Sequence, residues 1–256
     1  MEGVEGKLDR IIKNTKPKIS FMITFTGKGS RIEKTFQPEI AITAGCHYEI
    51  AFTSLETYYS IPNINKTNNT FSISRDAGTW DDVEVDTGCY GLIGLNAAIG
   101  RKLKVHEMAM AVEFKANYNT FKCTMILKAG FAVKFPEKGS LSTVLGFDKK
   151  IYKAGGEETR YESERTVNIM TVNSILVHCD LVGGSYLNEM RVPVIHSFFP
   201  LADPGDKIVE KPSEYIYLPI PSDVIRHMTV WLTDQDQNLL DLRGETLTVK
   251  FHLRSC

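Results

Sequence analysis

Three stretches of the chain alternate apolar and polar side chains with a period of two: NSILVHCDLV at 173–182, RHMTVWLT at 226–233 and TLTVKFHLR at 246–254. Such alternation predicts β-strands with one buried face. Between and around them lie clusters of residues that favour turns, at 200–205, 219–223, 234–238 and 243–244. Strands at this interval indicate a β-sandwich or a barrel.

Further strands are predicted upstream by alternation and by β-branched and aromatic residues. They cover 19–25, 48–52, 70–74, 82–86, 110–114, 121–127 and 131–135. Apolar residues at helical spacing predict one short helix over 88–103. The polar segment 149–165 contains Gly155 and Gly156 and is expected to be an exposed loop, and the charged segment 204–212 a loop edge with a structural or interface role.

A succession of segments in the C-terminal third resembles a known family. In chain order they read HCDLVGGSYLN, VPVIHSFFP, PGDKIVEKP, YLPI and LTDQDQNLLDLRGETLTVKFHLR. They are similar to the C-terminal half of the minor capsid (penton) proteins of Polinton/Maverick elements and adintoviruses. The resemblance continues more loosely upstream through FQPEIAIT, YEIAFTSLETYYSIPNI, NNTFSI, WDDVEVDTGCY and VLGF at 144–147, and so covers the chain from about Lys18.

The resemblance implies an all-β fold: a single jelly-roll β-sandwich with inserted loops, extra strands and one short helix. It also implies a structural virion protein that forms homopentamers at icosahedral vertices beside a major capsid protein, with a vertex spike or a host receptor as further partners. We expect one jelly-roll penton domain over 18–256, because no linker or repeat divides the chain, preceded by an N-terminal arm at 1–17. The spacing of Val4, Leu8 and Ile11 leaves a short amphipathic helix and a frayed terminus both open for the arm.

Composition limits the other functions that the chain could have. A formal net charge of -1 disfavours general nucleic-acid binding, so no specific nucleic acid is expected as a partner. No apolar run resembles a signal peptide or a membrane span. The five cysteines show no paired spacing, and Cys46, Cys123 and Cys179 are expected to be buried thiols. We therefore expect synthesis in the host cytoplasm and a place in the virion, with assembly in the nucleus left open.

Motifs for catalysis are missing from the sequence. The six histidines never form the HxH pair that a cupin metal site needs, and there is no GxSxG or phosphate-binding glycine loop. His178 and Asp180 are expected to be a solvent-facing polar pair on a half-exposed strand. We predict no catalytic residue, no cofactor and no metal, and hence no enzyme. The alternative from another class is a soluble jelly-roll binding module, carbohydrate-binding or cytokine-like, and a cupin-like enzyme is disfavoured.

Three aromatic residues are candidates for contacts between copies of the chain. Trp231 lies opposite the apolar face of its strand, while Tyr215 and Tyr217 alternate with Ile216 and Leu218. Aromatic residues on an outward face are typical of interface cores. A second layer or an inserted loop that covers them is the alternative, and the sequence leaves both open.

Overall fold

The computed structural model describes residues 19–42, 46–169, 171–222 and 224–255. The N-terminal arm expected at 1–17 lies outside these residues. Contacts divide the chain into two compact units. Unit 1 comprises the chain up to Tyr59, Ser174–Ala202 and the chain from Asp206 onward, and unit 2 comprises Ser60–Asn173 with Asp203–Gly205.

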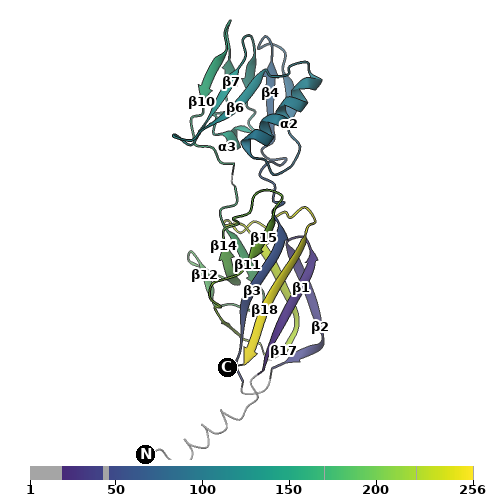
Figure 1. Ribbon diagram of the computed structural model, residues 1–256. Coiled ribbons are helices and arrows are strands. Elements are labelled where there is room, and N and C mark those ends of the chain that lie inside the picture. The colour runs from purple at the N-terminus through teal and green to yellow at the C-terminus, as the bar shows by residue number, and fades with distance from the viewer. Residues whose placement is uncertain (1–18, 43–45, 170, 223, 256) are drawn as a thin grey trace, which may run out of the picture. The chain divides into compact units, whose positions relative to one another are not determined.

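Unit 1 is built from two antiparallel sheets of four main strands each (Figure 1). The first sheet has the order β1 (Ser20–Lys28), β18 (Thr246–Ser255), β3 (Tyr48–Tyr58) and β15 (Lys207–Glu210), and β16 (Leu218–Ile220) pairs with the other end of β3. The second sheet has the order β14 (Val194–Phe198), β11 (Ile175–Cys179), β17 (Val224–Thr233) and β2 (Arg31–Ala41). A small hairpin of β12 (Ser185–Leu187) and β13 (Met190–Val192) lies between β11 and β14 in the chain.

The strand order of unit 1 is that of a jelly roll. When its eight main strands are numbered along the chain, the first sheet reads 1-8-3-6 and the second reads 5-4-7-2. Strands 1 and 8 pair along their full length although more than 200 residues separate Ser20 from Arg254 in the chain. This arrangement of two four-stranded antiparallel sheets defines the jelly-roll sandwich. The expected fold class, a mostly β jelly-roll sandwich, is confirmed.

The inner faces of the two sheets form the core of unit 1. On β18 the side chains of Leu247, Val249, Phe251 and Leu253 are fully buried, as the alternation at 246–254 predicts. Phe251 contacts the rings of Phe25 and Phe52 edge-on, at centroid distances of 6.5 and 6.3 Å. Close packing of this kind holds β1, β18 and β3 together.

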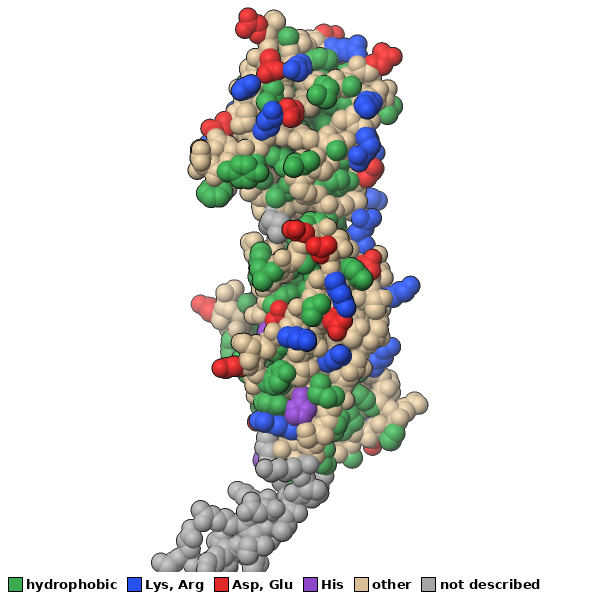
Figure 2. Space-filling model, in the orientation of Figure 1, with side chains coloured by type: hydrophobic (Ala, Val, Ile, Leu, Met, Phe, Trp, Pro, Cys, Tyr) green, Lys and Arg blue, Asp and Glu red, His purple; other side chains and the backbone are tan. Residues whose placement is uncertain are grey.

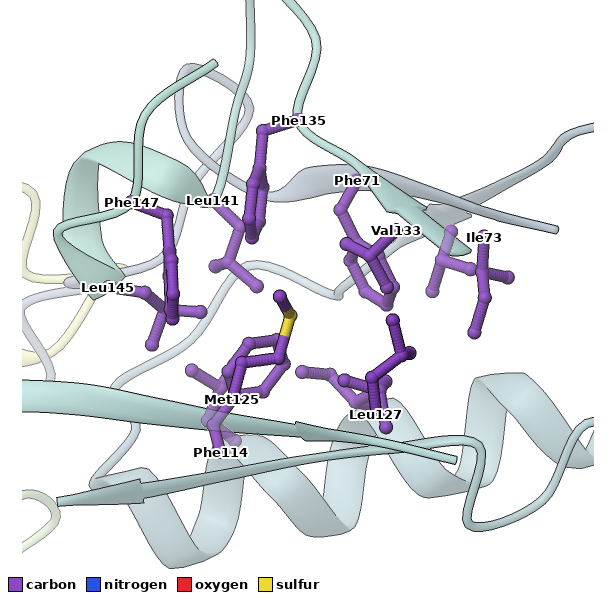
Figure 3. Packing of buried hydrophobic residues seen from close by; sticks show 14 of the residues in the cluster. Phe71, Ile73, Phe114, Met125, Leu127, Val133, Phe135, Leu141, Leu145 and Phe147 are labelled. Atoms are coloured by element: carbon purple, nitrogen blue, oxygen red, sulfur yellow. The ribbon is translucent and has the colours of Figure 1, made fainter. Parts of the chain in front are cut away.

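Unit 2 is inserted between β3 and β11 and has its own sheets. One has the order β5 (Asp81–Glu84), β4 (Thr70–Ser74), β8 (Ala132–Lys134) and β9 (Ile151–Lys153), and the other β10 (Thr159–Glu162), β7 (Lys122–Leu127) and β6 (Val112–Asn117). The helices are α2 (Leu92–Val105) and α3 (Ser142–Leu145). Phe71 and Val133 point toward Met125 and Leu127 across a core in which Phe147 also takes part (Figure 3).

Three expectations differ from the structure. From the sequence, one domain is expected over 18–256, whereas the contacts give two compact units, each with a buried core. The chain enters unit 2 through buried Ile61, Asn63 and Ile64, so the boundary lacks the exposed side chains of a linker. The segment 149–165 is not only a loop, because it contains β9 and β10, whose backbones pair with β8 and β7. The predicted helix begins at Leu92 and extends to Val105 rather than covering 88–103.

Candidate interface on the outer faces of the jelly roll

Trp231 is the centre of a stack of side chains on the outer face of the second sheet. It lies in register with His178 on β11 and with Arg31 on β2, the strands on either side of β17. The rings of Trp231 and His178 are parallel, with centroids 4.9 Å apart and an interplanar angle of 9°. The guanidinium carbon of Arg31 lies 5.7 Å from the Trp231 ring centroid, within cation–π range. We call these three residues the Trp231 stack.

His178 is the buried member of this stack and packs against one face of the Trp231 ring. Its side chain is only 3% exposed, so the expectation of a solvent-facing residue is wrong. The cause is that β11 is buried on both faces, whereas alternation predicts one buried face. The Thr233 hydroxyl donates to the Asp234 carbonyl at 3.1 Å, so it accepts from His178 Nε2 at 2.8 Å. Burial lowers the pKa of His178, which favours the neutral imidazole with its proton on Nε2.

The second candidate surface is on the outer face of the first sheet. Tyr217 Oη and His252 Nδ1 lie 2.6 Å apart, and His252 Nε2 lies 2.7 Å from Ser20 Oγ. Arg254 places its guanidinium carbon 3.4 Å from the Tyr217 ring centroid and donates to Glu49 Oε2 through Nε and Nη2 at 3.2 and 3.1 Å. These five residues form what we call the Tyr217 cluster. It fixes the half-buried Tyr217 ring against β18.

Tyr215 does not belong to the Tyr217 cluster. It is 56% exposed, and its neighbour Ile216 is 68% exposed. The expected alternation of Tyr215 and Tyr217 with Ile216 and Leu218 does not extend through this segment, because β16 begins only at Leu218. The structure therefore holds Tyr217 in place by named contacts and leaves the Tyr215 side chain mostly in solvent.

Trp231 and Tyr217 lie on opposite outer faces of the sandwich. Val230 and Leu232 point into the core from β17, so Trp231 points away from it, while Phe251 and Leu253 point inward from β18 and His252 and Arg254 outward. Unit 1 thus presents two different aromatic surfaces, one on each sheet. Figure 2 shows that charged side chains of both signs are interspersed with hydrophobic ones over the outer face of the first sheet.

The groups that could carry chemistry do not converge. Across residues 19–255, apart from the undescribed 43–45, 170 and 223, no three His, Cys, Asp or Glu side chains come together as metal ligands would. The Asp180 carboxylate accepts a hydrogen bond from the Thr229 N–H at 2.9 Å instead of joining His178. Cys123 and Cys179 are buried as expected, and burial raises the pKa of each thiol to about 12, whereas Cys46 is only half-buried. Neither helix that the structure describes is long and apolar enough to cross a membrane.

Sequence reasoning found Trp231 and Tyr217 but missed most of the residues that hold them. Arg31, His252, Arg254 and Glu49 carry no motif, and they meet the aromatic residues only through strand register. The sequence predicts His178 as a solvent-facing polar residue rather than as a support for Trp231. The signal that could have found these residues is the pairing of β11 with β17 and of β18 with β3, which a single sequence does not reveal.

The fold and these surfaces define an eight-stranded jelly-roll protein with a domain inserted between its third and fourth strands. No protein-family model matches the chain, and no curated protein is significantly similar to it in sequence. Among solved structures, the chain is similar to the mavirus penton protein, with 11% identity and a TM-score of 0.48 over 94% of this chain and 100% of that one. A match to the D2–D3 domains of the flagellar cap protein FliD from Escherichia coli has 11% identity and a TM-score of 0.16, over 84% of this chain and 100% of that one. The fold assignment rests on the strand order of unit 1.

Proposed function

We propose that the protein is a structural virion protein of penton type, which forms homopentamers at the icosahedral vertices of a Polinton-like virus capsid. The observation that carries the proposal is the jelly roll of unit 1 with a fixed aromatic residue on each of its two outer faces. Jelly rolls serve as capsid building blocks. The segments from HCDLVGGSYLN to LTVKFHLR, which resemble the penton family, support the same role. The major capsid protein is the expected partner, and a vertex spike or host receptor a further one.

Ring closure requires two different surfaces on each copy. An isologous dimer uses one self-complementary patch, whereas a cyclic pentamer uses a heterologous contact in which one patch meets another on the next copy. The Trp231 stack and the Tyr217 cluster lie on opposite sheets, so one copy can contact two neighbours at once. We assign Trp231 to one side of the contact and Tyr217 to the other, with the exposed Tyr215 at its edge.

Trp231 has the properties of an interface anchor. His178 on one side and Arg31 on the other already restrict its ring in the single chain. A restricted side chain loses little rotamer entropy on binding, which otherwise costs about 0.5 to 1.5 kcal/mol per side chain. Truncation of an aromatic hot spot typically weakens binding by about 2 kcal/mol or more, which is roughly 30-fold in Kd.

Native mass spectrometry of the full chain tests the oligomeric state. Five copies support the vertex role, three copies would favour a soluble binding module, and a metal-containing monomer or dimer would favour a cupin-like enzyme. Trp231→Asp is expected to give mostly monomer that remains folded. The matched control Leu201→Asp places the same charge at a residue that is 92% exposed and outside both surfaces, and should assemble as the wild type does. Full assembly of Trp231→Asp would exclude Trp231 from the contact.

Mixing two variants tests the heterologous geometry directly. Trp231→Asp keeps an intact Tyr217 cluster, and Tyr217→Asp keeps an intact Trp231 stack. Each variant alone should be monomeric, while a mixture should form a 1:1 heterodimer through the one remaining pair of intact surfaces. Mixtures that stay monomeric, or homodimers of Tyr217→Asp, would contradict the assignment of these two surfaces to one contact.

A further inference from the structure

His178 is nearly enclosed by protein and has one unused ring nitrogen. Nε2 donates to Thr233, while Nδ1 is buried and has no hydrogen-bond partner among the residues that the structure describes. As an acceptor, Nδ1 carries only a lone pair in the neutral ring. Protonation would turn it into a buried N–H donor without an acceptor, which is strongly unfavourable.

Among the residues that the structure describes, no acidic side chain is hydrogen-bonded to the His178 ring. The charged and titratable groups on the packed strands are Cys179 on β11, Arg31, Glu33, Lys34 and Glu39 on β2, Arg226 and His227 on β17, and His196 on β14, with Asp180 directly after β11 and Asp234 directly after β17. The Asp180 carboxylate accepts a hydrogen bond from the Thr229 N–H, and the Asp234 carboxylate accepts from the backbone and side-chain N–H groups of Asn238 at 2.8 and 3.0 Å. His196 stacks on Phe52 at the inner face. Arg31 adds positive charge on the far side of Trp231.

From this geometry we infer that His178 is the positioning residue for Trp231, and that its protonation releases Trp231 from the stack and makes the contact between copies acid-labile. The inference rests on the proposed function, because the contact at Trp231 is its site. In the neutral state the parallel imidazole fixes the Trp231 ring. In the protonated state a buried cation lies against that ring opposite Arg31, so the packing between β11 and β17 opens and the anchor is lost.

The direction of the pH effect follows from burial. Desolvation lowers the pKa of His178 in the folded chain below the ordinary value of about 6.5. The stabilisation that comes from neutral His178 is complete above that ordinary value and is lost as the pH falls below it. One proton taken up on opening changes the equilibrium up to tenfold per pH unit.

The experiment follows the oligomer and Trp231 together between pH 8 and pH 5. Trp80 is the other tryptophan of the chain, so in a Trp80→Phe background the fluorescence reports Trp231 alone. We expect loss of the oligomer by native mass spectrometry and a change in Trp231 emission over the same pH range below 6.5. His178→Phe keeps a ring against Trp231 but binds no proton, and should remove both transitions. His227→Phe, at an exposed position of β17, should leave both in place.

The possible results separate this inference from the proposed function. The inference is overturned if the wild-type oligomer persists to pH 5, or if the His178→Phe oligomer dissociates at the same pH as the wild type. Either result leaves the proposed function standing. A chain that is monomeric at every pH contradicts the proposed function. In that case an emission change that disappears with His178→Phe still supports the coupling of His178 to Trp231, and the absence of such a change overturns it.

Discussion

Replacing Gly146 with alanine is expected to destabilise unit 2 strongly, because the backbone here leaves no room for a side chain. Gly146 ends α3 with a φ of +81°, in the left-handed region. A Cβ added to it would lie 2.3 Å from the Arg165 carbonyl oxygen and 2.9 Å from the Thr166 carbonyl oxygen. These are backbone atoms, so no side-chain rotation relieves the clash.

The magnitude follows from what must move. A left-handed conformation costs alanine about 1 kcal/mol relative to glycine. Moving the Arg165 segment away breaks two backbone hydrogen bonds, from Arg165 N–H to the Gly146 carbonyl at 2.9 Å and from Asn168 N–H to the Val144 carbonyl at 2.8 Å. Each broken bond costs about 1 kcal/mol, and more where a group stays buried. We expect Gly146→Ala to lower the free energy of unfolding of unit 2 by about 3 to 5 kcal/mol.

The assay uses Trp80, which lies in unit 2, while Trp231 lies in unit 1. In a Trp231→Phe background, urea unfolding followed by Trp80 emission reports unit 2 alone. Gly130→Ala is the matched control, because Gly130 has a similar φ of +77° but its added Cβ would meet nothing closer than 4.0 Å. We expect a loss of about 1 kcal/mol for this control. Equal losses for the two variants would refute the close approach to Arg165 as the cause.

Two further predictions concern polar contacts in unit 2, with the same Trp80 assay. Although burial raises the pKa of Glu164, hydrogen bonds from Lys150, a backbone N–H and Tyr152 outweigh it and hold that pKa at about 2. Glu164→Gln should therefore lower the stability of unit 2 at pH 7 and reduce the loss of stability between pH 4.5 and pH 2. An unchanged pH dependence would contradict this. The Asn96 side chain accepts from Phe114 N–H at 2.9 Å and donates to its carbonyl at 2.6 Å, so Asn96→Ala should cost about 2 kcal/mol. Asn96→Asp keeps the acceptor but places a carboxylate oxygen against the Phe114 carbonyl, so it should cost at least as much as Asn96→Ala, and a smaller loss would argue against the pair of bonds.

Local patterns predicted individual elements well. The alternation at 246–254 corresponds to β18, and the strand predicted at 70–74 coincides with β4. Helical spacing located α2 to within a few residues. These predictions succeed because periodicity depends on which face of one element is buried. The N-terminal arm and the interface role of Trp231, Tyr215 and Tyr217 stay predictions.

The sequence did not predict features that depend on residues far away in the chain. β9 contains one buried residue, Tyr152, and an exposed Ile151, so no alternation reveals it, and its backbone is stabilised by pairing with β8. His178 looked polar and outward, yet the protein around both faces of β11 buries it. The division into two units was not predicted for the same reason, because the strand pattern of Ser60–Asn173 continues that of the flanking segments.

The sequence by itself determined that the chain contains a β-sandwich or a barrel, because the alternation of β17 and β18 leaves one apolar face on each strand that must be covered. Only the tertiary structure decided that the sheets read 1-8-3-6 and 5-4-7-2, that a second core is inserted after β3, and that Arg31, Trp231 and His178 meet. Register between strands far apart in the chain is fixed by packing of the whole sandwich. The residues that hold Trp231 and Tyr217 in place follow from that register.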